Sequence, residues 1–273
     1  MNRKQLKDQA RESLKDSGNG PKKVTLIFLV SFVVLTVLRF LLTELVGNVD
    51  MGGNYLSNAV SSEAKVLALT YVVSFAMQII IALLCVGYTA AALEMKNKNP
   101  VGHGSLLAGF RLSARAILAY VLMDLFLGLW ASACSLPLTY GLTLLLTMDE
   151  AVLGENTIMA IMVAYVAVVM FILSYRYRTL FFGLMDNPGL TARQALRQAV
   201  DITRGHRFQL FLLDLSFLPW FLLSILTCGV LFIWKLPYIM TTYAHAYEYL
   251  LRDYRQRQEH FRQLREKMMR ERM

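Results

Sequence analysis

The feature that most constrains this 273-residue chain is its series of long apolar runs. A helix of about 20 apolar residues crosses the ~30 Å hydrocarbon core of a bilayer. Lipid offers backbone groups no hydrogen-bond partners, so a spanning segment must be helical or part of a closed barrel. Long apolar runs occur at residues 24–46, 66–93, 116–136, 157–180, 208–226 and 230–251. We therefore expect an all-α membrane protein that forms a bundle of six transmembrane helices.

The composition agrees with a membrane protein. Hydrophobic residues make up 56% of the chain and charged residues 17%, whereas soluble domains average about 25% charged residues. The formal net charge is +9. A nucleic-acid-binding protein would carry such a charge as a patch on a soluble fold, but here the charges lie between apolar runs. We therefore expect membrane lipids as partners and no nucleic acid.

The placement of lysine and arginine predicts the topology. Nearly all of the 28 basic residues lie in the segments 1–23, 94–115, 176–207 and 252–273. The three connections on the opposite side contain only Lys65. Cytoplasmic connections carry the excess of basic residues in membrane proteins. We therefore expect a multi-pass protein of the cytoplasmic membrane with both termini in the cytoplasm.

Pro137 interrupts an apolar stretch, residues 116–147, that is too long for one straight span. Proline lacks the backbone N–H that continues a helix. The helix is therefore expected to break or kink at Pro137, with residues 138–147 as a bent or interfacial continuation of the third span.

Residues 1–23 precede the first run and are polar and basic. One helical face would gather Leu6, Ala10, Ser13 and Leu14, which predicts an amphipathic helix in the cytoplasmic interface of the membrane. The alternative is a solvated tail, because helices of this length are marginal in water.

A second amphipathic helix is expected at residues 191–204. Thr191 and Gln194 have the spacing of a capping box, and Gly205 suits the C-terminal end of the helix. The basic cytoplasmic surface predicted here consists of Arg193, Arg197, Arg204, His206 and Arg207. Anionic lipid headgroups are its expected partners, and another membrane or cytoplasmic protein is a second candidate.

The last segment, residues 252–273, has twice as many basic as acidic residues. A loose apolar stripe runs through Leu250, Tyr254, Phe261, Leu264 and Met268. We expect the sixth helix to continue into the cytoplasm along this stripe. The alternative is a solvated basic tail that anionic lipid attracts.

Three segments carry motifs of a known family. They are residues 1–7, residues 105–110 and a longer block, residues 186–238. The block includes Asp186-Asn187-Pro188, Ala195-Leu196-Arg197, Gly205-His206 and Phe211-Leu212-Leu213-Asp214-Leu215-Ser216-Phe217. Together these segments resemble the bacterial integral membrane family called domain of unknown function 975. The resemblance implies the membrane architecture and brings no established activity.

Two further positions of the block match the family, Trp220 and Pro237-Tyr238. Two features depart from its pattern. Pro219 stands where glycine is common before the tryptophan, and the region 137–156 is longer than usual. Both departures concern helix packing on the predicted outer side and leave the topology unchanged.

Four ionisable residues fall within the apolar runs: Arg39, Asp124, Asp214 and Lys235. Such groups are costly in lipid and are functional candidates by default. We expect Asp214 to pair with Arg176 or Arg178 and so to hold the fourth helix against the fifth. The alternative is a proton- or cation-coupled site built on Asp124 and Asp214. The two cations are expected to snorkel outward or to pair with Glu44.

The common catalytic patterns do not occur in the sequence. It has no His-Glu-x-x-His, no Gly-x-Ser-x-Gly and no glycine loop for phosphate. The four histidines are scattered, and the three cysteines lack metal or redox spacing. We therefore expect no cofactor, no metal and no enzymatic activity.

The distinctive sequence lies on the predicted inner face. This placement favours a non-enzymatic accessory or regulatory membrane component that works through its basic cytoplasmic surface. The alternative is a transporter for a small solute or a lipid, which would use Asp124 and Asp214 beside the proline-broken helices at Pro137, Pro219 and Pro237. An intramembrane enzyme ranks third, because the sequence offers neither a nucleophile nor a metal set.

Overall fold

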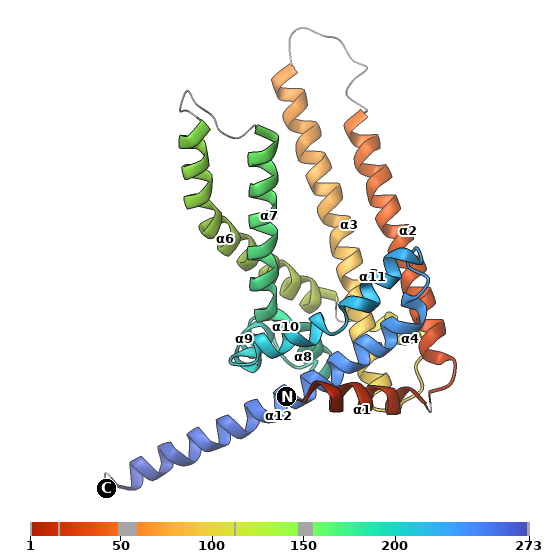
Figure 1. Ribbon diagram of the computed structural model, residues 1–273, viewed down its shortest axis with the longest axis vertical. Coiled ribbons are helices and arrows are strands. Elements are labelled where there is room, and N and C mark those ends of the chain that lie inside the picture. The colour runs from red at the N-terminus through yellow and green to blue at the C-terminus, as the bar shows by residue number, and fades with distance from the viewer. Residues whose placement is uncertain (1, 16, 49–58, 112, 147–154, 272–273) are drawn as a thin grey trace. The chain divides into compact units, whose positions relative to one another are not determined.

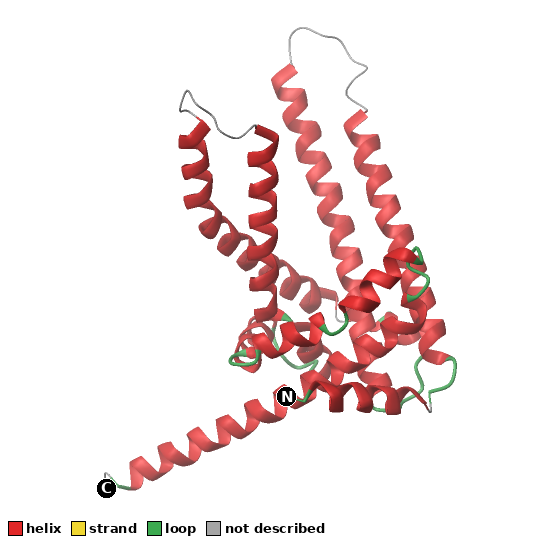
Figure 2. Ribbon diagram, viewed as in Figure 1, coloured by secondary structure: helices red, strands yellow, loops and turns green. Residues whose placement is uncertain are grey.

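The computed structural model describes residues 2–15, 17–48, 59–111, 113–146 and 155–271. Within these residues every regular element is a helix and no strand occurs (Figure 2), which confirms the predicted all-α fold. The elements are α1 (Arg3–Lys15), α2 (Gly20–Asn48), α3 (Ala59–Lys96), α4 (His103–Leu106), α5 (Ala108–Arg111), α6 (Ser113–Leu146), α7 (Glu155–Ser174), the 3-10 helix η2 (Tyr175–Tyr177), α8 (Leu180–Asp186), α9 (Ala192–Thr203), α10 (Arg207–Leu215), α11 (Leu218–Leu226) and α12 (Phe232–Arg270).

Among the described residues, five helical segments are long and apolar enough to cross a membrane. They are Gly20–Leu45, Leu67–Lys96, Ala114–Gly141, Met159–Asp186 and Arg207–Leu226. Each overlaps one of the first five predicted spans, and five such segments are typical of a multi-pass membrane protein. The predicted sixth span, residues 230–251, falls in α12 and is not among the five. Lys235, His245 and Glu248 interrupt its apolar sequence.

The chain divides into two compact units. The first unit contains residues 118–216 and 247–273, and the second contains residues 2–117 and 217–246. Each unit holds one pair of long apolar helices, α6 with α7 in the first and α2 with α3 in the second.

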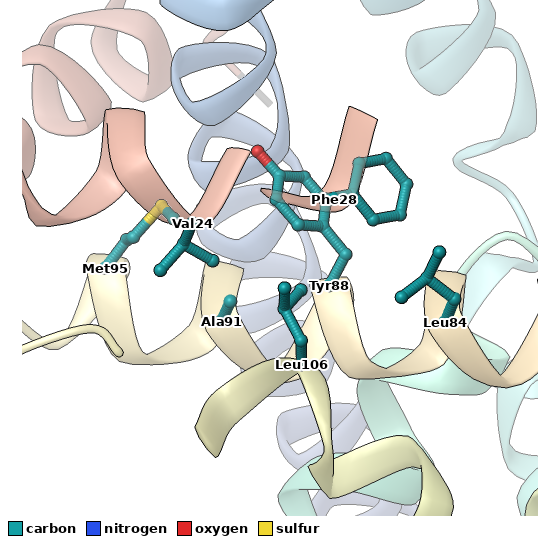
Figure 3. Close-up of a cluster of buried hydrophobic side chains, with 7 residues drawn as sticks. All are labelled: Val24, Phe28, Leu84, Tyr88, Ala91, Met95 and Leu106. Carbon is teal, nitrogen blue, oxygen red and sulfur yellow. The ribbon is translucent and has the colours of Figure 1, made fainter. Parts of the chain in front are cut away.

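In the second unit α2 and α3 lie side by side (Figure 1). Their apolar side chains and one from α4 form a buried cluster (Figure 3) of Val24, Phe28, Leu84, Tyr88, Ala91, Met95 and Leu106. The rings of Phe28 and Tyr88 stack with their centroids 4.3 Å apart. The Tyr88 hydroxyl lies 2.7 Å from Thr25 Oγ1, so the one polar group of the cluster has a partner.

The N-terminal segment is a folded part of the second unit. Leu6, Ala10 and Ser13 of α1 are buried, as the predicted helical face requires, so the solvated-tail alternative is wrong. Ser13 Oγ donates to the backbone oxygen of Lys96 at 3.3 Å and lies 3.1 Å from His245 Nε2. The apolar face of α1 is thus covered by its own protein.

In the first unit Tyr165 of α7 donates its hydroxyl proton to the backbone oxygen of Cys134 in α6 at 3.1 Å. α6 is helical from Ser113 to Leu146 and contains Pro137, so of the predicted break or kink the structure excludes the break. Figure 1 shows that α6 bends along its length. A proline removes one backbone hydrogen bond, and a helix tolerates that loss by bending.

The predicted fifth span, residues 208–226, is two short helices rather than one. α10 ends at Leu215 and α11 begins at Leu218, so Ser216 and Phe217 separate them. Pro219 lies in the first turn of α11, where its missing N–H costs nothing. This proline therefore suits the start of a new helix, and its position explains why the apolar run forms two helices and not one.

The tight turn predicted between the fifth and sixth segments is confirmed. Cys228 and Gly229 have φ angles of +49° and +84°, and the Gly229 N–H donates to Ser224 O at 2.7 Å. α12 then continues without interruption to Arg270. The helical form of the C-terminal segment is therefore confirmed over the solvated tail.

Candidate functional site

The polar contacts of the first unit gather where η2, α9 and α10 meet beside the second half of α12. Figure 1 shows α8, α9 and α10 collected at the end of α7. Two threonines join the elements: Thr203 Oγ1 donates to the backbone oxygen of Arg176 at 3.1 Å, and Thr179 Oγ1 donates to that of Ala199 at 3.5 Å. We call this region the helix junction.

α9 has the caps that its sequence predicts. The Thr191 side chain accepts from the Gln194 N–H, the Gln194 side chain accepts from the Thr191 N–H, and Gly205 has φ +86°. Its apolar face is buried against η2 and α8 through Ala192, Ala195, Leu196, Ala199 and Ile202. This face stabilises the junction and is not open to lipid.

Asp214 of α10 is held by two donors from η2 and the residue after it. The Tyr175 hydroxyl donates to Oδ2 at 2.7 Å, and Nη2 of Arg178 donates to Oδ1 at 3.2 Å. The Asp214 side chain is 19% exposed, against 40% for Arg178. Phe171 and Phe211 pack edge-on against the Tyr175 ring. The carboxylate therefore ties α10 to the end of α7.

The other two members of the predicted acid and base set lie elsewhere. Arg176 places its guanidinium over the Trp130 ring, 5.8 Å from the centroid. Asp124 is exposed on α6, whereas the Asp214 side chain is only 19% exposed. The two acids therefore occupy different environments in the first unit.

The cations of the second unit were predicted to snorkel outward or to pair with Glu44, and among the described residues the pairing with Glu44 does not occur. Nη1 of Arg39 donates to Gln78 Oε1 at 2.6 Å, which links α2 to α3. Lys235 Nζ lies 3.9 Å from the centroid of the Trp220 ring. An amide oxygen and an aromatic face satisfy a cation without a second charge, so neither residue needs the carboxylate.

The five residues of the predicted basic surface separate into two groups. Arg193, Arg197 and Arg204 are exposed, whereas His206 and Arg207 are half-buried. His206 is held on both sides: its Nδ1 lies 3.0 Å from Gln209 Oε1, and its Nε2 lies 3.0 Å from Asp253 Oδ2. Only the three exposed arginines therefore present their charge freely on this surface.

α12 fastens the loop between α9 and α10 through a set of contacts that we call the α12 latch. Asp253 Oδ2 lies 2.8 Å from Nη2 of Arg257, and Nη1 of Arg257 donates to the backbone oxygen of Arg204 at 3.3 Å. The hydrogen bond from His206 and the charge of Arg257 lower the pKa of Asp253. Because this pKa is depressed on folding, the latch stabilises the fold above the ordinary carboxyl pKa and loses that effect as the pH falls through the folded value.

Sequence reasoning missed Asp253 and Arg257. They lie 47 or more residues beyond His206, in a segment that the charge pattern describes only as basic. The available signal was their i,i+4 spacing, which places an acid and a base on one helix face.

Side chains that could hold a metal do not come together. Among the described residues no three of His, Cys, Asp and Glu gather in a metal-binding arrangement. Cys85, Cys134 and Cys228 are free thiols.

Comparison with known families supports the resemblance in the motifs. The family described as Protein of unknown function (DUF975) matches residues 1–253. The chain belongs to the DUF975 family. The matched region contains the whole helix junction and ends at Asp253, so the remainder of α12 lies beyond it. No curated protein and no solved structure shows significant similarity to this DUF975 member.

Proposed function

We propose that this protein is a six-span component of the cytoplasmic membrane, without catalytic activity, that acts as an accessory or regulatory protein through its cytoplasmic side. The observation that carries the proposal is the helix junction. It buries the apolar face of α9 and leaves Arg193 and Arg197 exposed on the opposite face. A rigid helix that displays arginines suits recognition of anionic lipid headgroups, with a membrane or cytoplasmic protein as a second kind of partner.

The contacts of the two intramembrane acids support this function over a transporter. Asp214 is engaged by Tyr175 and Arg178, whereas Asp124 is exposed on α6. A proton- or cation-coupled transport site would need both carboxylates to face one cavity. The hydrogen bonds that Asp214 accepts from Tyr175 and Arg178 fit a structural role better.

Substitution of the exposed Arg193 and Arg197 tests whether α9 recognises anionic lipid headgroups. We expect the wild-type protein, extracted from nanodiscs of mixed phosphatidylglycerol and phosphatidylethanolamine, to retain phosphatidylglycerol selectively in native mass spectrometry. Arg193→Glu with Arg197→Glu should lower that selectivity severalfold, because each basic residue near an anionic surface contributes about 1 kcal/mol. The matched control is Arg262→Glu with Arg265→Glu on the exposed end of α12. Equal lipid retention by the wild type and the α9 variant would refute the role of this surface.

A six-span topology with both termini in the cytoplasm is part of the proposal. The segment Arg207–Leu226, which contains α10 and α11, has 20 residues, and the tight turn at Cys228 returns the chain into α12. Thr241, Thr242 and Ala244 of α12 are buried in protein. A span that protein surrounds need not be apolar on every face, which accounts for the low hydropathy of α12.

Cysteine labelling checks this topology. In a Cys85→Ser and Cys134→Ser background, the exposed Cys228 should react with a membrane-impermeant maleimide in intact cells. A cysteine at Gly189, which lies in the basic connection and has open space around it, should react only after permeabilisation. If Cys228 also needed permeabilisation, the hairpin of α11 and α12 would not reach the outer side, and the six-span count would be wrong.

A further inference from the structure

Three arginines of the first unit gather at the helix junction. The hydrogen bond from Thr203 to the backbone oxygen of Arg176 brings η2 beside the end of α9, next to Arg204. Arg204 and Arg207 flank the left-handed turn at Gly205. Three positive groups from two separate parts of the chain thus share one place.

Among the described residues of the first unit, no carboxylate pairs with these three arginines. Over the described ranges of the chain, none of the three arginines forms an ion pair. Asp214 is engaged by Arg178, and Asp253 by His206 and Arg257. Asp201, three residues before Arg204 on α9, forms no ion pair with the three arginines among the described residues. The Nε atoms of Arg176 and Arg207 are also buried without a hydrogen-bond partner. A buried charged donor without an acceptor is costly, so this place favours an anion from outside the chain.

The chemistry of the three groups selects the kind of anion. Guanidinium groups present planar forks of N–H donors that match the oxygens of phosphate, often in pairs. The guanidinium carbon of Arg176 lies over the Trp130 ring, 5.8 Å from its centroid, so its contact there is an uncharged ring and not a carboxylate. Three arginines that are not paired with an acidic side chain within the described part of the chain match the charge of a phosphate ligand better than that of a singly charged carboxylate ligand.

We propose that Arg176, Arg204 and Arg207 form a binding site for one phosphate group, carried by an anionic phospholipid headgroup or by a free phosphate compound. The α12 latch prepares the site, because Arg257 holds the backbone of Arg204 and Asp253 holds His206 within the same turn. The inference rests on the proposed function for the cytoplasmic location of the junction. It differs from that function in requiring one discrete site rather than a charged helix face.

Thermal denaturation of the purified full-length protein in detergent tests the site. The probes are inorganic phosphate, with chloride at equal ionic strength as reference, and dihexanoyl-phosphatidylglycerol, with dihexanoyl-phosphatidylcholine as its zwitterionic reference. We expect saturable stabilisation of the wild type by at least one of the two anionic probes. Arg176→Gln and Arg207→Gln should each raise the apparent Kd about tenfold or more, because each removes a hydrogen bond between charged groups. The matched control, Arg262→Gln with Arg265→Gln on the exposed end of α12, should bind as the wild type does.

The two probes also separate the sources of the phosphate. If inorganic phosphate stabilises the protein, a free phosphate compound is sufficient to occupy the site. If only phosphatidylglycerol stabilises it, the site requires a lipid headgroup. Without either probe, Arg207→Gln should be at least as stable as the wild type, since it removes an uncompensated charge. A variant that loses stability without ligand, or fails to fold, would assign Arg207 a purely structural role and overturn the proposal.

Two further results would overturn the site. One is the absence of saturable stabilisation by both anionic probes. The other is an equal loss of binding in the Arg262 and Arg265 control, which would indicate diffuse attraction. In either case the lipid selectivity measured with Arg193→Glu and Arg197→Glu still decides the proposed function by itself.

Discussion

Gly109→Ala is expected to destabilise the second unit by about 3 kcal/mol or more, because the added methyl group has no space. A Cβ at Gly109 would lie 2.1 Å from the backbone oxygen of Leu83 and 2.8 Å from the backbone nitrogen of Gly87. Real Cβ atoms essentially never come within 3.0 Å of another heavy atom outside their own local chain. Both obstacles are backbone atoms of α3, so relief requires α5 to move away from α3.

Gly87→Ala should have a comparable effect from the other side of this contact. A Cβ at Gly87 would lie 1.9 Å from the backbone oxygen of Leu106, which also belongs to the buried cluster of Figure 3. Moving α4 outward would therefore open that cluster as well as the helix contact. Small residues allow helix backbones to approach closely in membrane proteins, and alanine is already too large at these two positions.

The measurement is the yield of monodisperse protein in detergent, followed by thermal denaturation. Gly104→Ala is the matched control, since Gly104 also lies in α4 and has no atom within 4 Å of its added Cβ. We expect the control to match the wild type. If Gly109→Ala were as stable as Gly104→Ala, the close backbone contact between α3 and α5 would not exist in the folded protein.

Removing the carboxylate of Asp214 is the second change with a large expected effect. Asp214→Ala leaves the Tyr175 hydroxyl and the Arg178 guanidinium without their shared acceptor. Loss of a buried charged acceptor costs about 2–3 kcal/mol. The exposed Arg178 should contribute only about 0–1 kcal/mol of this. Thermal denaturation should therefore rank Asp214→Ala as most destabilising, then Tyr175→Phe, then Arg178→Gln.

The same geometry predicts the result of a charge exchange. Asp214→Arg with Arg178→Asp restores opposite charges but gives Tyr175 a cation where it now meets a carboxylate. The exchange should therefore recover only part of the lost stability. Asp124→Ala is the matched control, because Asp124 is also an acid of an apolar helix but is exposed. Equal stability of the Asp124 and Asp214 variants would show that the tie between α10 and η2 contributes nothing.

Local patterns predicted helices α1 and α9 well. The face of α1 and the capping box of α9 depend on residues within four positions of each other, and both are confirmed. The predictions for longer apolar stretches were less accurate. α6 passes through Pro137 without ending, while Ser216 and Phe217 separate α10 from α11 beside Pro219. A proline has the same local effect in both places, but its position within the packed helix decides whether the chain bends or begins a new helix.

The partners of the charged residues were harder to predict than the helices. The sequence offered Asp214 two arginines, and the structure places Arg178 at the carboxylate and Arg176 at the Trp130 ring. Arg39 meets Gln78, which lies 39 residues away on the next helix. Such choices depend on how each helix is rotated about its axis, and hydropathy does not report that rotation.

The sequence by itself determined that this chain has several apolar helices long enough to cross a membrane. Apolar runs of membrane-spanning length and the helical periodicities between them are properties of neighbouring residues, so they can be recognised before any folding. Only the tertiary structure decided which groups meet across α3 and α5, at Asp214 and at the α12 latch. These contacts join residues far apart in the chain, and their distances follow from close packing of whole helices, in which a single methyl group is enough to forbid an approach.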